Sequence, residues 1–218
     1  MIAYAVRAVP WSRIALAGTL IVLLMELVRW DPRVLWPLEG TAVGLLAGAT
    51  AWCFDETAAV VVDVAPRGLA WRATARASGV TALASAWTGV VLHAGQAALF
   101  DHRNTVLVQG FAAMALGGAY ACWWRARGEA VPGLLFASAV APATTAWALV
   151  RPFDGQLVVF PYGTTSPSGW QLSAIAWAGS GMLALGILVA AVAEAPWWRR
   201  RGHRSPASRQ PALQERPD

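Results

Sequence analysis

Five polar side chains stand inside stretches of sequence that are otherwise apolar: Glu26, Glu39, His93, Gln96 and Gln109. On insertion scales an ionisable group costs about 2.5 to 3.5 kcal/mol at the middle of a membrane, so each needs a partner or a function. Glu26 is expected to pair with Arg29, three residues on, or to extend toward the interface. A carboxylate and an imidazole at similar depth can line a substrate route or a proton path. The candidate residues of such a translocation path are Glu39, His93, Gln96 and Gln109.

No spacing typical of a catalytic or metal site occurs in the chain. The histidines, His93, His102 and His203, are too dispersed for a metal or haem site, and Cys53 and Cys122 have no metal-ligand spacing. The GxxxxGK[ST] sequence that binds the phosphates of ATP is absent. We therefore predict a protein that is not an enzyme and binds no metal or cofactor, so that any ATP hydrolysis belongs to a partner.

The composition is that of a membrane protein. Hydrophobic residues make up 57% of the 218 residues and charged residues 13%, which leaves too little polar surface to cover a soluble core. The apolar stretches are about 20 residues long, the length of a membrane-spanning helix and twice that of a barrel strand. We predict an all-α, polytopic membrane domain over residues 1–198. Its six transmembrane helices are expected at residues 12–30, 34–54, 78–100, 105–124, 130–151 and 169–195.

The arginines indicate the orientation of these spans. All 17 basic residues are arginine, and with the N-terminus inside, thirteen of them lie in inner segments and four in outer ones. This bias is typical of a multi-pass protein with both termini cytoplasmic, here in a bacterial plasma (inner) membrane. The polar, proline-bearing tail 199–218 is predicted to be disordered, with its first arginines against anionic lipid headgroups and without a role in nucleic-acid binding.

Two connections are far longer than the others: the inner segment 55–77 and the outer segment 152–168. In the inner segment, Asp55 can cap a short helix whose first turn holds Glu56, and Pro66 disfavours its continuation. Long connections of this kind often carry function.

A second helix is predicted to start near Leu69 and to merge with the third span. Arg72 and Arg76 lie four residues apart and therefore on one face of this helix. That pattern predicts a basic helix lying at the cytoplasmic membrane surface.

This plan resembles the permease subunits of type 2 ABC transporters. The inner segment "FDETAAVVVDVAPRGLAWRATAR" also resembles an acidic, alanine-rich, Pro-Arg-containing segment common in actinobacterial members of this group. The resemblance implies that residues 55–77 are a coupling segment that docks on a separate ATPase subunit. It also implies that the outer segment forms short re-entrant helices, and that two permease subunits, identical or different, work as a pair.

The implied function is export of a substrate by a permease subunit that a separate ATPase drives. On this interpretation the acidic residues of the segment contact the ATPase, while its valines hold the helix to the membrane domain or to the partner. The residues assigned to partner binding are Asp55, Glu56, Val60, Val61, Asp63, Val64 and Arg67. A proton-coupled secondary carrier and a non-transporting membrane scaffold or immunity-type protein are the alternatives.

Small residues recur along two of the predicted spans. Gly40, Gly44 and Gly48 repeat every four residues, and the fourth span carries a weaker stripe that includes Gly110 and Gly117. Such stripes let helix backbones approach closely in lipid. Packing within one chain and a seam between two copies both fit this pattern.

Overall fold

The computed structural model describes residues 8–56, 68–151 and 158–202, with side chains up to residue 193. All regular structure in these ranges is helical, which confirms the all-α fold class for this part of the chain. The helices are α2 (Trp11–Trp30), α3 (Pro32–Leu35), α4 (Pro37–Trp52), α6 (Leu69–Ala98), α7 (Arg103–Ala126), α8 (Pro132–Val150) and α9 (Pro167–Gly202). The short helix predicted before Pro66 and the residues Val60, Val61, Asp63, Val64 and Arg67 lie outside the described residues.

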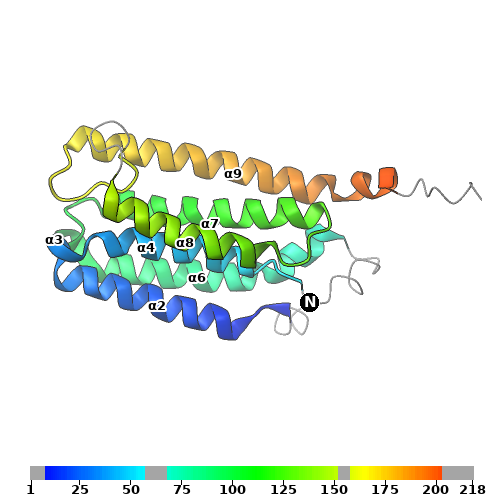
Figure 1. Ribbon diagram of the computed structural model, residues 1–218, viewed down its shortest axis with the longest axis horizontal. Helices are drawn as coiled ribbons and strands as arrows, with labels where there is room; N and C mark the ends of the chain where they lie inside the picture. The colour runs from blue at the N-terminus through cyan, green and yellow to red at the C-terminus, as the bar shows by residue number, and fades with distance from the viewer. Residues whose placement is uncertain (1–7, 57–67, 152–157, 203–218) are drawn as a thin grey trace, which may run out of the picture.

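The long helices form one bundle of alternating direction (Figure 1). Helices α2, α6 and α8 run one way along it, and α4, α7 and α9 run the other way. The start of α2, the end of α4, the start of α6, the connection from α7 to α8 and the end of α9 therefore lie at one end, which we call the inner end. The short helix α3, the turn between α6 and α7 and the loop before α9 lie at the opposite, outer end.

Four helices are long and apolar enough to cross a membrane: α2, α7, α8 and the Pro167–Ala193 part of α9. Of the other two predicted spans, α4 has only 16 residues, which at about 1.5 Å per residue is shorter than the hydrocarbon layer. Helix α6 has 30 residues, but its arginines, serines, threonines and His93 make it less apolar. Its start at Leu69 agrees with the prediction, whereas α9 continues as helix to Gly202 through residues predicted to be disordered.

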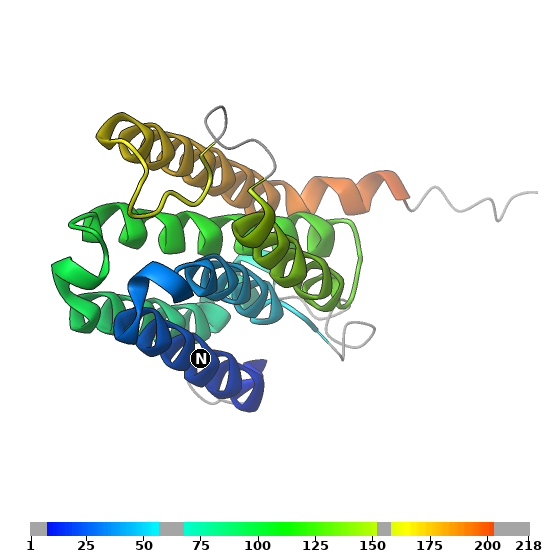
Figure 2. The same ribbon diagram turned by 60° about the vertical axis from the view of Figure 1, so that its left-hand side comes forward.

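Helix α4 occupies the centre of the bundle and contacts α2, α6, α7 and α8 (Figure 2). Eleven of its 16 residues are buried. Its glycine stripe faces α8 of the same chain, since a Cβ placed on Gly40 would lie 2.7 Å from Cβ of Ala148, and one on Gly48 would lie 2.9 Å from Cβ of Ala137. The stripe is therefore a seam inside one chain, which excludes these glycines from a seam between two copies.

The second stripe also packs within the chain. A Cβ on Gly117 of α7 would overlap the carbonyl oxygen of Ala47 in α4, and one on Gly110 would overlap the ring of Trp87 in α6. Large apolar side chains, in contrast, are exposed on the outer faces of α2, α8 and α9, among them Leu23, Leu135 and Met182. Small residues inside and large apolar residues outside are the arrangement of a bundle whose solvent is lipid.

The packing of α7 on α4 predicts a strong effect of one methyl group. Gly117→Ala places Cβ against the Ala47 backbone, which cannot rotate away, so we expect a loss of about 1 to 3 kcal/mol in unfolding free energy. Gly89→Ala in α6 is the control, because nothing lies within 4 Å of a Cβ there and alanine favours helix. Unfolding in detergent measures both, and equal stability of the two variants would contradict the close approach.

Candidate functional site

The carboxylate of Asp55 caps helix α8, while the short helix that it is predicted to cap lies outside the described residues. Its Oδ1 accepts a hydrogen bond of 2.7 Å from the backbone N–H of Gly133, in the first turn of α8. The N–H groups of a first turn have no partner within their own helix, so a carboxylate from elsewhere in the chain satisfies one of them and interacts favourably with the helix dipole. Asp55 thus joins the end of α4 to the beginning of α8.

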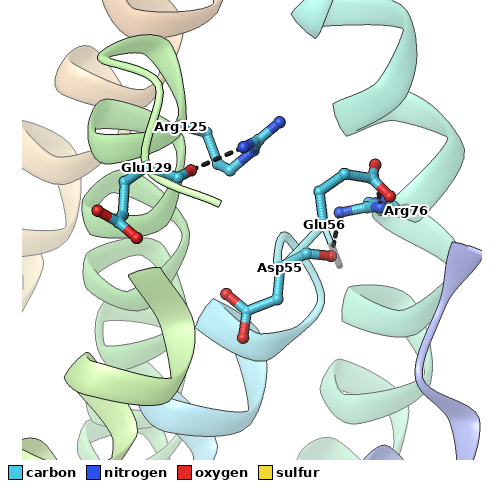
Figure 3. A network of polar contacts seen from close by, with 5 residues as sticks. All are labelled: Asp55, Glu56, Arg76, Arg125 and Glu129. Carbon is cyan, nitrogen blue, oxygen red and sulfur yellow. Dashed lines mark hydrogen bonds and ion pairs between the residues drawn. The ribbon is translucent and has the colours of Figure 1, made fainter. Parts of the chain in front are cut away.

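Arg76 ties α6 to the same point (Figure 3). Its Nη1 donates to the carbonyl oxygen of Asp55 at 2.6 Å, and its Nη2 forms an ion pair with the carboxylate of Glu56. The backbone N–H of Glu56 donates to the carbonyl of Ala130, just before α8, at 2.9 Å. The group Asp55, Glu56 and Arg76, named here the inner junction, therefore links the ends of α4, α6 and α8.

Helix α7 ends beside the inner junction. Arg125 in its last turn is buried and donates to the carbonyl of Glu129 at 2.7 Å, which closes the connection to α8 (Figure 3). A shallow pocket between α6 and α7 is lined by Glu56, Arg72, Arg76 and Arg125 together with apolar side chains. Four helix ends thus meet in one buried, charged cluster, from which segment 57–67 departs.

Arg72 and Arg76 do not face a membrane surface, contrary to the prediction of a basic surface helix. Both are buried, at 4% and 3% exposure. The spacing correctly placed them on one face of α6, but that face packs against α4 and α7 because Glu56 and the Asp55 carbonyl offer acceptors there. Asp55 and Glu56 likewise make contacts within the chain, and their contact with a partner stays a prediction.

Burial raises the pKa of Asp55 above its ordinary value, because the charged form loses its water. The hydrogen bond from Gly133 and the positive charges of Arg13 and Arg76 lower the pKa, but by less than burial raises it. The fold therefore favours the protonated form of Asp55 relative to an exposed aspartate.

At the outer end, residues 158–166 form an irregular loop without the short helices that the resemblance implies, and residues 152–157 of the same segment lie outside the described residues. The carbonyl of Val159 accepts hydrogen bonds from Oγ of Ser173 at 3.0 Å, from Nε1 of Trp177 at 2.9 Å and, at a longer 3.5 Å, from Nε2 of Gln109. Nε1 of Trp36 donates to the carbonyl of Pro161 at 2.6 Å. Tryptophan and polar side chains of three regions thus hold this loop on the bundle.

The four predicted translocation residues fall into two different environments. Glu39 and Gln109 have no exposed surface, whereas His93 and Gln96 lie on the surface of α6. His93 approaches Glu26, with 3.4 Å between Nε2 and Oε1, and Glu26 forms the expected ion pair with Arg29 at 2.9 Å. The structure therefore separates the carboxylate of Glu39 from the imidazole that the sequence analysis grouped with it.

Sequence reasoning missed Arg76 as the centre of the inner junction and Trp36 as an anchor of the outer loop. No local signal identifies either pairing, since the partners stand 20 and 125 residues away. Within the described ranges, no group of three histidine, cysteine or acidic residues is able to hold a metal ion. Comparison of the chain with protein-family models, curated proteins and solved structures found no match.

The cap on α8 predicts a graded effect of substitutions at Asp55. Asp55→Ala removes the acceptor of the Gly133 N–H, and we expect it to cost about 1 to 2 kcal/mol, as lost helix caps do. Asp55→Asn keeps a carbonyl oxygen in place and should cost less. Unfolding in detergent at several pH values measures both variants.

The raised pKa gives this comparison a defined pH dependence. The folded protein binds a proton at Asp55 at a pH where the unfolded chain does not, so this contribution is fully present below the ordinary aspartate pKa and is lost as pH rises through the raised pKa. Wild-type protein should therefore gain stability over Asp55→Asn on acidification across that range. A difference between the two proteins that stays constant with pH would contradict the effect of burial.

The buried ion pair of Arg76 and Glu56 predicts that replacing one partner lowers the stability more than replacing both. Arg76→Met leaves the carboxylate of Glu56 buried without its guanidinium, at an expected cost of about 3 to 5 kcal/mol. Adding Glu56→Leu removes the second charge, so the double variant should be more stable than Arg76→Met alone. Arg29→Met breaks an exposed pair and should cost at most about 1 kcal/mol. Additive costs in the double-mutant cycle would argue against the pair.

Proposed function

We propose that this chain is the membrane-spanning permease subunit of an ABC transporter in a bacterial inner membrane, driven by a separate ATPase that contacts segment 55–77. The observation that carries the proposal is the inner junction. A force applied to this segment reaches α4 through residues 55 and 56 and α6 through Arg76, and the Gly133 bond passes it to α8. A loose attachment would absorb such a force, whereas residues 55 and 56, which are buried and bound to Arg76, transmit it.

The proposal includes six membrane spans with both termini cytoplasmic. Helices α4 and α6 join the four apolar helices as the second and third spans; the neighbours of α4 bury most of it, so this short helix does not itself have to match the thickness of the lipid. The common position of the start of α2 and the end of α9 agrees with this topology (Figure 1). The exposed apolar faces of α8 and α9 then contact lipid or a second permease subunit, and the transport direction is outward.

The test is whether an ATPase accompanies the protein. Tagged chain, purified from the membranes of its own host, should retain an ATPase subunit. Val61→Asp should lose both this subunit and transport, because it places a charge in the run of valines that we assign to partner binding. Ser168→Asp is the matched control: it adds the same charge at the exposed start of α9, at the outer end, and should leave both unchanged.

Two results would overturn the proposal in favour of the alternatives. Transport that stops when the proton gradient collapses while ATP stays intact, with no ATPase bound, would indicate a proton-coupled carrier. Neither an ATPase nor any transport would indicate a scaffold or immunity-type protein. Normal ATPase retention by Val61→Asp would remove segment 55–77 from the partner contact.

A further inference from the structure

Glu39 is a carboxyl group in the interior of the bundle. It stands in the first turn of α4, has no exposed surface, and neither of its carboxyl oxygens has a hydrogen-bond partner among the described residues. A bare carboxylate in such surroundings is strongly unfavourable, because nothing replaces the water that it loses. The charged residues of the inner junction do not contact Glu39, because they lie at the other end of the bundle.

Gln109 of α7 lies at the same level of the bundle as Glu39. Helices α4 and α7 run in the same direction (Figure 1). Gly117 of α7 packs on the backbone of Ala47 in α4. Gln109 precedes Gly117 by eight residues, and Glu39 precedes Ala47 by eight residues, so the two polar residues lie at the same distance along their helices from this contact. Gln109 is also fully buried, and its Oε1 has no partner in the described part of the chain, whereas its Nε2 points to the outer loop.

Trp87 of α6 reaches the same level from the other side. Its ring packs against Gly110, the residue that follows Gln109, and its Nε1–H is buried without an acceptor in the described part of the chain. Three buried polar groups with unfilled hydrogen-bond needs therefore lie at one depth, on three neighbouring helices. The missing partners differ: Nε1–H of Trp87 lacks an acceptor, Oε1 of Gln109 lacks a donor, and both carboxyl oxygens of Glu39 lack a partner.

We propose that Glu39 is a proton-binding site of the bundle, with its carboxyl group protonated at neutral pH. A protonated carboxyl carries no charge and both donates and accepts, so it suits a level where Oε1 of Gln109 needs a donor and Nε1–H of Trp87 needs an acceptor; neither group is hydrogen-bonded to Glu39 in the structure. An ionised carboxylate would only accept and would leave Oε1 of Gln109 unfilled. The proposal does not rest on the proposed transport function.

The charged groups on the helices around α4 do not supply an alternative partner. At this end they are Glu26 and Arg29 of α2, Arg33 of α3, His93 of α6 and Arg103 of α7, and α8 has no titratable residue. Glu26, Arg29 and His93 pair with one another at the surface. Among the described residues no basic side chain forms an ion pair with Glu39, so a proton is the ligand that neutralises it.

Proton release at Glu39 has a consequence for the outer loop. An ionised Glu39 requires donors, and the amide of Gln109 supplies them only by turning its NH₂ group away from the carbonyl of Val159. Proton binding at Glu39 thus preserves one of the contacts that hold residues 158–166 on the bundle, and proton loss weakens their attachment, while the bonds from Ser173, Trp177 and Trp36 remain.

Infrared spectroscopy of the full chain in lipid nanodiscs tests the site directly. Wild-type protein at neutral pH should show the C=O band of a protonated carboxylic acid, which Glu39→Gln should lose and Glu26→Gln, a surface control, should keep. Gln109→Leu should shift the band to higher frequency, because the acid loses its acceptor; this variant, together with the wild-type spectrum, keeps the test decisive if Glu39→Gln fails to fold.

Several results would overturn the proposal. These are the absence of the band in wild-type protein at neutral pH, its persistence in Glu39→Gln, and its loss on adding sodium or potassium chloride at constant pH, which would assign the site to a metal cation. The loop provides a second readout: hydrogen exchange in residues 158–166 should rise at alkaline pH beyond the general effect of pH in wild-type protein and not in Glu39→Gln. The same rise in both would remove the link between Glu39 and the loop.

Discussion

The close approach of α4 to its neighbours is the constraint on which the rest of the structure depends. In lipid, apolar side chains gain little by leaving one apolar surface for another, so helices associate by contact between atoms and by interhelical hydrogen bonds. Gly44 and Gly48 of α4 bring its backbone against α8, and Gly117 brings α7 against α4. This compact centre leaves the larger apolar side chains for the outer faces of α2, α8 and α9, where they suit a lipid environment.

The same packing concentrates polar chemistry at the two ends of the bundle. At the inner end, four helix ends converge, and buried arginines donate to two backbone carbonyls and to the carboxylate of Glu56. At the outer end, Trp36, Ser173 and Trp177 bond the carbonyls of the loop before α9. The contacts at the two ends differ in kind: buried ion pairs at the inner end, and hydrogen bonds from tryptophan and serine to backbone carbonyls at the loop before α9.

Individual residues show how far sequence reasoning reaches. The Glu26–Arg29 pair and the start of α6 near Leu69 follow from spacing along one helix, and the structure contains both. The environment of Arg72 and Arg76 does not follow, because the spacing gives their common face but not the neighbours of that face. His93 meets Glu26 on α2 and not Glu39 for the same reason: residues of similar depth can lie on opposite sides of a helix.

The sequence by itself determined the membrane class, the all-helical fold and the approximate ends of the helices, because these depend on composition and on spacing within single segments. Only the tertiary structure decided that α4 is central, that Asp55 caps α8, and that Glu39 is enclosed without a partner in the described chain. Such pairings join residues up to 125 positions apart, and a helix carries several faces whose neighbours are chosen when the whole bundle packs together. The spacing of residues along one helix therefore does not predict which neighbour each face contacts.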